Sequence, residues 1–373
     1  MVLMKKELFS AIWTFVGVTV GAGVFALPYV FSKAGFLTAL IVFIFTAIFM
    51  TIITLYLGEV VLRTRGKHQL TGLAEKYLGT KGKTIMFIAN SLSIFGILAA
   101  YIIAGGQALG AIFGFNSFWF QFVFFALIAP VIYFGIKIID GFEWIFTPIK
   151  IIVVVTLSLL LVKLLDFSNF SSLNVYNLFI PYGVAIFAFA GISAVPEMNE
   201  ELTNKKLLRQ SIIYGMIITF VINILFAVFV MGSIKNVNEV ATVSLMNVSF
   251  SIGMFANLFA LFSIATAFVA LGFALKENLT LDYKVNNLLS GSVVIFVPFL
   301  IVLSGFLGFI QLLDIVGAVC LGIILIMIMI MHSKAKFLCN RIPEYDLKDN
   351  KFLKVFLVVV LLIGIIYTLK LFY

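Results

Sequence analysis

Two hydrophobic stretches contain small, helix-breaking residues at places where a membrane helix should be continuous. They are residues 17–23, with the sequence GVTVGAG, and residues 187–196, with the sequence FAFAGISAVP. In a bilayer, unwound main chain is stable only where it lines a cavity or is buried in protein, and paired breaks of this kind mark solute sites. The two stretches therefore predict a solute-binding site built from main-chain groups.

The first break offers hydrogen-bond donors and acceptors in one place. Unwinding at Gly21, Ala22 and Gly23 frees main-chain N–H groups at the start of the following half-helix, where the helix dipole favours a carboxylate. The carbonyl groups just before them, including those of Thr19 and Val20, can accept hydrogen bonds from an ammonium group or bind a cation. A free amino acid carries one carboxylate and one ammonium group, so this arrangement predicts an amino acid site.

The second break predicts the opposite wall of the same site. Carbonyl groups of residues 187–190 would complete the ammonium site, and Phe187 and Phe189 offer aromatic faces to a cation. The alternative is that the glycines only allow helices to pack closely, since residues 17–21 have the Gly-x-x-x-Gly spacing. Breaks in corresponding helices of two halves favour the solute site.

Lys150 is the most informative single charge. It lies in the sequence TPIKIIVV, about 9 Å along the predicted helix from Trp144 at the inner boundary. An ammonium group at this depth costs about 2.5–3.5 kcal/mol unless it reaches the interface or carbonyl partners. A lysine held away from water releases its proton more readily, so Lys150 is a candidate for loading and releasing a proton. The alternative is that its side chain extends to the cytoplasmic interface.

Three acidic residues also fall inside or at the ends of hydrophobic stretches: Glu59, Glu197 and Asp314. Each is a candidate proton site. Glu59 and Glu197 lie near the inner interface, where pairing with lysine or arginine side chains is the favoured interpretation. Asp314 is either a gate residue or a solvated one, and the sequence leaves its role open.

Ser263 and Thr266 form a polar pair in a later hydrophobic stretch. Because they are three residues apart, they share one helix face and are predicted to present a carbonyl and a hydroxyl group toward the first helix. Serine and threonine in membrane helices also commonly bond to their own main chain, and this alternative stays open.

The composition requires that membrane-spanning helices carry these residues. The chain has 373 residues, of which 63% are hydrophobic and 11% charged, and its mean hydropathy is +1.21. Solid apolar runs of about 20 residues predict helical spans and exclude the alternating segments of a β-barrel. Eleven spans are predicted, at residues 8–32, 36–62, 85–113, 118–136, 144–165, 176–197, 207–232, 253–275, 289–305, 306–331 and 353–372.

The distribution of basic residues orients the chain. With the N-terminus in the cytoplasm, most of the 25 lysines and arginines fall in inner loops, as the positive-inside rule requires. The expected location is therefore the cell membrane, with several passes and a cytoplasmic N-terminus. The same distribution explains the net charge of +9 by contact with anionic lipid headgroups, so no nucleic acid partner is expected.

One transmembrane domain covering residues 1–373 is predicted, because no soluble domain interrupts the spans. The five spans within 8–165 and the five within 176–331 have opposite topology, which is the arrangement of two inverted repeats. The first span of each repeat is the broken one. The span at 353–372 is unbroken and is expected to be peripheral or to form an oligomer contact, and the oligomeric state stays open.

Other classes of protein fit the sequence less well. A channel usually shows charge rings or a filter motif, and neither occurs in the spans, although a passive facilitator for small solutes stays open. An enzyme is disfavoured because His68 and His332 both fall in predicted inner loops, and no metal-binding spacing or carboxylate pair lies within the spans. We therefore expect no catalytic residue, metal or cofactor.

Four segments together resemble the amino acid/auxin permease family of the amino acid-polyamine-organocation superfamily, and in particular its hydroxy and aromatic amino acid permease branch. These are residues 19–29 (TVGAGVFALPY), 100–106 (AYIIAGG), 206–215 (KLLRQSIIYG) and 258–268 (LFALFSIATAF). Because they are spread over four predicted spans, the resemblance covers most of the chain. It implies a leucine-transporter-type fold of eleven helices, with helices one and six broken, and secondary active symport of neutral or aromatic amino acids with a cation.

The resemblance also implies where the substrate binds. The first break would hold its carboxylate, the second would line the other side, and Tyr101 would face the pocket from the third span. The residues expected to line the substrate site are Gly21, Ala22, Gly23, Tyr101, Phe187, Ala188, Phe189 and Gly191.

The coupling ion stays open between a proton and sodium. In the resembled fold, the second sodium site takes a carbonyl and two hydroxyl groups from helix eight; Ser263 and Thr266 match, whereas Ala267 lacks the last hydroxyl. Related proton-coupled transporters place a lysine amine of helix five where sodium would sit, so the hypothesis is that Lys150 carries a proton. The residues expected at the coupling site are Lys150, Thr19, Val20, Ser263 and Thr266.

Overall fold

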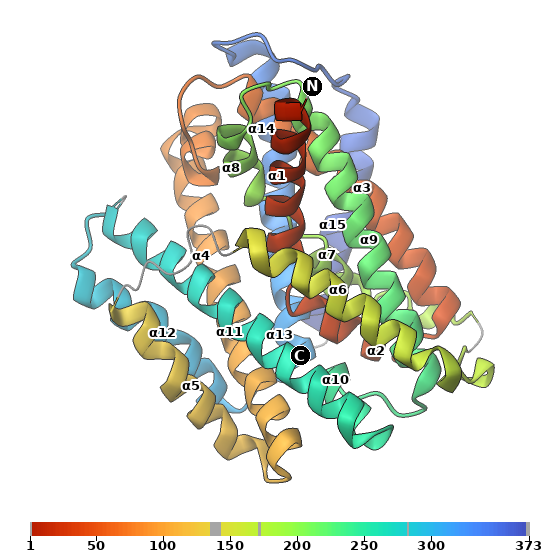
Figure 1. Cartoon of the computed structure of the whole chain (residues 1–373). Helices are drawn as coiled ribbons and strands as arrows, with labels where there is room; N and C mark the ends of the chain where they lie inside the picture. Colours follow the sequence, from red (N-terminus) through yellow and green to blue (C-terminus); the bar gives the residue numbers. More distant parts are fainter. Residues whose placement is uncertain (1, 135–142, 171–172, 282, 371–373) are drawn as a thin grey trace.

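The computed structural model describes residues 2–134, 143–170, 173–281 and 283–370 (Figure 1). These residues form helices joined by loops and short 3-10 turns, and no strand occurs among them. The helices are α1 (Val2–Thr19), α2 (Gly23–Ala34), α3 (Phe36–Leu62), α4 (Leu70–Phe113), α5 (Ser117–Phe134), α6 (Glu143–Leu161), α7 (Tyr182–Ala188), α8 (Ala194–Glu201), α9 (Leu207–Ser233), α10 (Ala241–Ser244), α11 (Phe250–Leu281), α12 (Asn287–Ser304), α13 (Phe309–Asp314), α14 (Gly322–Leu338) and α15 (Lys351–Lys370). A π-helix, η5 (Ile315–Leu321), joins α13 to α14.

The chain is a helical, multi-pass membrane protein. Among the described residues, eight helices are long and apolar enough to cross a membrane, and α1 with α2 forms a ninth span bent by 56°. The two remaining predicted spans, 118–136 and 176–197, correspond to the shorter apolar helix α5 and to the pair α7 and α8. The number of eleven therefore stays a prediction.

Both predicted breaks are present. Helix α1 ends at Thr19 and α2 begins at Gly23, while α7 ends at Ala188 and α8 begins at Ala194. Glycine costs about 1 kcal/mol relative to alanine inside a helix, so GVTVGAG is a weak point. Pro196 lies in the first turn of α8, where its missing N–H group has no cost, so it favours a new helix start.

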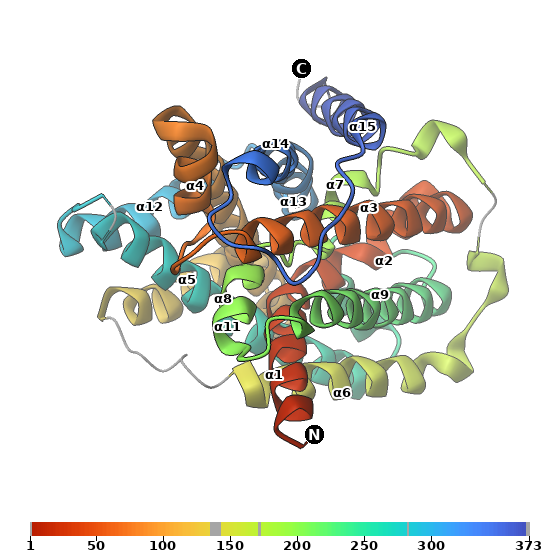
Figure 2. The ribbon, with the colours of Figure 1, turned by 90° about the horizontal axis from the view of Figure 1, so that it is seen from above.

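The two broken helices lie beside each other in opposite directions. Helix α1 packs against α8, and α2 packs against α7, so the first half of one helix accompanies the second half of the other. Helix α9 packs along α1, α2 and α3, as the view from above shows (Figure 2). The breaks are therefore enclosed by other helices instead of facing lipid.

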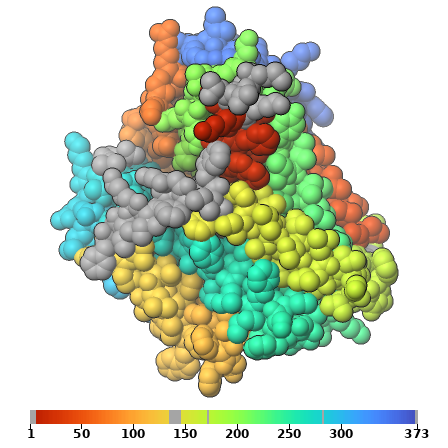
Figure 3. Space-filling view, viewed as in Figure 1, coloured from red at the N-terminus to blue at the C-terminus, as the bar shows by residue number. Residues whose placement is uncertain are grey.

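The outer surface is apolar, as a bilayer requires. Helices α5, α6 and α11 form much of the face shown in Figure 3. Their exposed side chains include Leu127, Ile152, Leu159 and Leu258. A broad apolar surface of this kind is typical of contact with lipid.

A buried ion network closes the C-terminal end of α3. Glu59 is fully buried, its Oε1 lies 2.8 Å from Nε of Arg63 and 2.6 Å from Nζ of Lys336, and its Oε2 accepts the main-chain N–H of Leu347 at 2.8 Å. The favoured interpretation, pairing with basic side chains, is confirmed for Glu59. The network joins α3, α14 and the loop before α15.

His332 belongs to the same network, and the prediction that it lies in an inner loop is wrong. It is fully buried in α14, with Nε2 3.0 Å from Glu59 and Nδ1 2.7 Å from Nζ of Lys354. An ammonium group only donates, so Nδ1 accepts and Nε2 carries the proton toward Glu59. In the loop, burial acts to raise the pKa of Asp349, but hydrogen bonds from Lys354 and Ser333 lower it overall. The sequence placed this histidine in a loop because the predicted span ended at residue 331, whereas α14 continues to Leu338.

We expect Glu59→Gln to destabilise the protein by about 3–5 kcal/mol, since it leaves buried cations without their counter-charge. Thermal unfolding of the purified protein in detergent measures this. The matched control is Glu75→Gln, which removes the partly exposed pair with Lys83 and should cost at most about 1 kcal/mol. Equal melting temperatures for the two variants would contradict the structural role of Glu59.

Candidate functional site

The two unwound segments touch each other directly. A side-chain Cβ on Gly23 would lie 3.0 Å from Cα of Ala188, so the main chains meet at a distance that only glycine allows without a shift. On the other side of the break, a Cβ on Gly191 would lie 2.5 Å from the ring of Phe15 and 2.7 Å from Cγ2 of Thr19. Glycine at these two positions therefore permits the close approach of the broken helices.

Helix α9 holds both breaks through two polar side chains. The Oγ1 atoms of Thr219 and Thr19 are 2.8 Å apart at the end of α1, and Nδ2 of Asn223 donates to the carbonyl of Ala188 at 3.3 Å at the end of α7. Thr219 and Asn223 are fully buried and four residues apart, so they share one helix face. The sequence analysis missed both, although two polar residues at this spacing in an apolar helix were a signal.

A cavity of about 500 Å³ begins at the breaks. Near the breaks, it is lined by Thr19, Gly21, Tyr101, Phe187 and Ala190. Its volume is in the range of small-molecule sites. The cavity thus brings both breaks and α4 around one space.

The far end of the cavity is polar. It lies by the start of α4, the last turns of α11 and the side of α8, which are the parts of these helices predicted to face the cytoplasm. The polar residues lining it are Gln69, Thr71, Asn90, Ser93, Ser193, Glu197, Glu277 and Asn278. Of these, only Glu197 was singled out from sequence, because hydropathy does not tell which polar residues at helix ends face inward.

The predicted substrate residues fall into two groups. Gly21, Tyr101 and Phe187 line the cavity, and the Tyr101 hydroxyl lies against the break, where a Cβ on Gly21 would be 3.3 Å from its oxygen. Ala22, Gly23, Ala188 and Gly191 are buried in the contact between the two segments, directly behind the lining.

Phe189 points elsewhere. It is fully buried, with its ring centroid 4.6 Å from that of Phe43 and 6.5 Å from that of Phe220, and it is not among the cavity-lining residues. The expected aromatic face toward a substrate therefore comes from Phe187 and not from Phe189. Phe187 lies in the last turn of α7 and Phe189 directly after its end, so their side chains point in different directions.

Four of the predicted coupling residues are buried and Thr266 is half-buried, and the three hydroxyl groups among them have different partners. Thr266 donates to the carbonyls of Phe262 and Ser263 in its own helix, at 3.1 and 3.0 Å, as the alternative interpretation expected. Oγ of Ser263 is buried and makes no hydrogen bond within the described part of the chain. Thr19 is committed to Thr219 and to its own helix, and Val20 is 3% exposed.

Lys150 is 8% exposed in α6. Helix α6 packs against α1, α9 and α11, so it lies between the first broken helix and the helix that carries Ser263. Both roles considered for Lys150, proton carriage and extension toward the interface, stay predictions.

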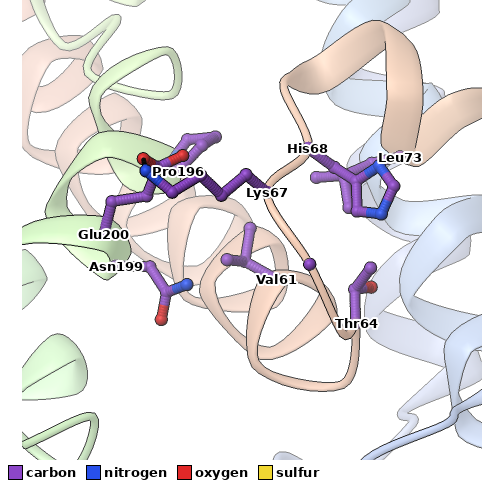
Figure 4. Close-up of a pocket in the computed structure, with 9 residues that line it drawn as sticks. Val61, Thr64, Lys67, His68, Leu73, Pro196, Asn199 and Glu200 are labelled. Carbon is purple, nitrogen blue, oxygen red and sulfur yellow. Dashed lines mark ion pairs between the residues drawn. The ribbon is translucent and has the colours of Figure 1, made fainter.

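A second, small hollow lies beside α8. It holds about 10 Å³, which is room for one water molecule, and is lined by residues of the loop after α3 and of α8 (Figure 4). Lys67 and Glu200 form an ion pair of 2.6 Å at its edge. It is too small for an amino acid, but the ion pair ties α8 to the loop between α3 and α4. No group of three metal-binding side chains occurs in the described ranges.

The model of the tryptophan/tyrosine permease family matches residues 4–369. The chain belongs to this family. The predicted resemblance to the aromatic amino acid permease branch is thereby confirmed, and so is the prediction that the protein is a transporter and not an enzyme.

Two curated relatives are similar over most of their length. The chain is 24% identical to Glutamine transporter 2 of Aliivibrio fischeri over 293 residues, covering 74% of this chain and 75% of that one. It is 25% identical to Tyrosine-specific transport system 1 of Haemophilus influenzae over 280 residues, covering 70% of each.

Solved structures show the same fold. MhsT in complex with L-phenylalanine superimposes with a TM-score of 0.70 at 15% identity, covering 97% of this chain and 98% of the other. Mhp1, a nucleobase-cation-symport-1 family transporter with bromovinylhydantoin bound, gives a TM-score of 0.61 at 15% identity, covering 86% and 77%. The fold is therefore of the leucine-transporter type.

We expect Gly23→Ala to reduce amino acid uptake about tenfold, since the added methyl group must separate the two breaks at a cost of about 1–3 kcal/mol. Uptake into proteoliposomes, normalised to the amount of folded protein, measures this. The control is Gly322→Ala, whose methyl group would meet only the flexible end of Ile365 at 3.3 Å. If both variants transported equally, contact at the breaks would not matter for transport.

Proposed function

We propose that the protein is a secondary active transporter that moves neutral or aromatic amino acids across the cell membrane by alternating access. The observation that carries this proposal is the meeting of two unwound segments at one cavity of about 500 Å³. The proposed architecture is a single domain of eleven membrane helices in two inverted repeats, within 8–165 and 176–331, plus a peripheral helix at 353–372. The N-terminus is proposed to be cytoplasmic.

In this proposal the substrate carboxylate binds at the start of α2, to the main-chain N–H groups of Ala22 and Gly23. The Tyr101 hydroxyl lies close by, against Gly21. The positive end of the α2 dipole favours that charge. The ammonium group faces carbonyl groups of the second break, and Phe187 contacts the side chain. These few polar groups provide both affinity and orientation.

The cavity described above corresponds to an inward-facing state in the proposed orientation. Its polar end, with Gln69, Glu197 and Asn278, offers a hydrated path from the breaks to the cytoplasm. The outer halves α2 and α7 pack against each other and close the opposite side. A transporter that alternates between such states can accumulate its substrate, whereas a passive facilitator cannot.

We propose a proton as the coupling ion, carried by Lys150. Its burial in α6 between α1 and α11 supports this role, and Ala267 gives no hydroxyl for a sodium site on α11. When charged, Lys150 would hold α6, α1 and α11 together, and loss of the proton would free the inner side. The second candidate is sodium symport, for which Ser263 would supply a ligand.

Imposed gradients separate these mechanisms. In proteoliposomes, we expect an inward proton gradient to drive accumulation of the substrate and an inward sodium gradient to have no effect. Lys150→Gln should abolish the proton-driven component, while Lys163→Gln, at an exposed position just after the end of α6, should leave it unchanged. Sodium-driven uptake that is indifferent to pH would rule out the Lys150 mechanism, and flux only down the substrate gradient would indicate a facilitator.

A thermal-shift screen against the twenty amino acids tests the substrate class. A ligand at a hundred times its Kd stabilises the state that binds it by about 2.7 kcal/mol, so a substrate should raise the melting temperature measurably. We expect the largest shifts for neutral and aromatic amino acids. No shift with any amino acid at either of two pH values would contradict the proposed substrate class.

A further inference from the structure

Asp314 is a buried carboxylate that the proposed substrate and coupling sites do not use. It ends α13, about 7.5 Å along the helix from Phe309, at the point where the chain enters the π-helix η5. The residue is 8% exposed. Thr368 of α15 donates to Oδ2 at 3.2 Å, whereas Oδ1 makes no hydrogen bond of normal geometry to a described residue. No ion pair joins it to a described lysine or arginine.

Three glycines bring the surrounding helices against this carboxylate. A side chain on Gly183 of α7 would overlap Asp314, and one on Gly317 of η5 would overlap the carbonyl of Gly183. A side chain on Gly364 of α15 would overlap the ring of Tyr182, the first residue of α7. Helix α7 is therefore packed tightly between η5 and α15, and the carboxylate of Asp314 lies against the first turn of α7. Any outward movement of α7 must change the surroundings of Asp314.

The charge state of Asp314 is coupled to this movement by desolvation. An ionised carboxylate buried without a cation costs several kcal/mol, whereas its protonated form is neutral. When α7 is packed on η5 the protonated form is favoured, and when α7 moves away water can solvate the ionised form. A π-helix next to the acid fits a functional position, because such helices occur frequently at functional sites.

We propose that Asp314 is an outer proton-binding site, and that its protonation stabilises the closed packing of α7, the outer half of the second broken helix, against η5 and α15. This inference rests on the proposed alternating access and deepens it, since it assigns a trigger to the outer side. The proton bound here returns to the outside when α7 opens. It is thus distinct from a proton carried across the membrane by Lys150.

Among the described residues, no histidine lies near Asp314 in this half of the membrane. The elements packed against α13 and η5 are α4, α7, α14 and α15. Their other titratable groups in the same half of the membrane are Tyr101, Tyr182, Cys320, Tyr367 and Lys370, the last of which is exposed at the end of α15. The carboxylate of Glu239, from the loop before α10, also reaches the first turn of α13, where its Oε2 lies 3.5 Å from the main-chain N of Ile310. Glu59, His332 and the remaining lysines of α4, α14 and α15 belong to the opposite end of these helices.

Cys320 is a natural reporter of this movement. It is 7% exposed in η5, and the chain has two cysteines, so Cys339→Ser leaves Cys320 alone. The experiment measures the rate at which a membrane-impermeant maleimide, added outside proteoliposomes, modifies Cys320 as the outer pH is varied. Because the thiol itself reacts faster at high pH, each rate is divided by that of the Asp314→Asn variant at the same pH. Asparagine stands for the permanently neutral state.

We expect the ratio of wild-type to Asp314→Asn rates to rise about tenfold from about pH 5 to about pH 8, because ionised Asp314 favours the open state. Asp166→Asn, which removes an exposed aspartate outside the spans, should behave like wild type. Thr368→Val removes the donor to Oδ2 and should move the transition to higher pH without abolishing it. A ratio that is constant with pH in both the wild-type and Thr368→Val backgrounds would overturn the proposal.

Measurements of melting temperature and of uptake distinguish this proposal from its alternatives. If Asp314 only held the fold together, Asp314→Asn would lower the melting temperature and the ratio would stay flat, and the proposal would fail. The labelling needs no substrate, so its result does not depend on the amino acid assignment. Absent uptake together with a pH-dependent ratio would overturn the proposed function alone, whereas normal proton-driven uptake with a flat ratio would overturn this inference alone.

Discussion

The contact between Gly23 and Ala188 is the constraint on which the rest of the structure depends. Two unwound segments can meet in a membrane only if their main chains approach closely and their vacant polar groups find partners. Glycine allows the two main chains to approach, and Thr219 and Asn223 of α9 form hydrogen bonds with polar groups at the two breaks. Residues of both segments line one cavity. The same feature that weakens each helix therefore creates the site.

Buried charge is treated in two different ways in this protein. Around Glu59, cations from α3 and α14, together with a neutral histidine, complete a closed network, so the carboxylate stays ionised and the helices stay joined. Around Asp314, no described cation offsets the cost of ionisation, and the packing is held by glycines instead. A buried carboxylate paired with cations holds its helices together firmly, whereas a buried carboxylate without a cation gives a helix contact whose stability depends on protonation. The second kind lies against α7.

The comparisons with solved structures define the fold and leave the chemistry to particular residues. At 15% identity to MhsT and to Mhp1, the shared property is the arrangement of the helices. That arrangement places Tyr101 and Phe187 at the cavity and α6 between α1 and α11.

The helical membrane class, the family and the position of both breaks could be predicted from the sequence. These follow from local composition, because a lipid environment demands about 20 apolar residues for each span and glycine weakens a helix wherever it occurs. The direction of a side chain from an unwound segment is not local in this sense. Only the tertiary structure decided that Phe187 faces the cavity and Phe189 packs on Phe43. The tertiary structure also placed Asn223 at the end of α7 and His332 inside the bundle. Hydropathy could not predict these contacts, because they join residues more than thirty positions apart and the hydropathy of one helix carries no information about its neighbours.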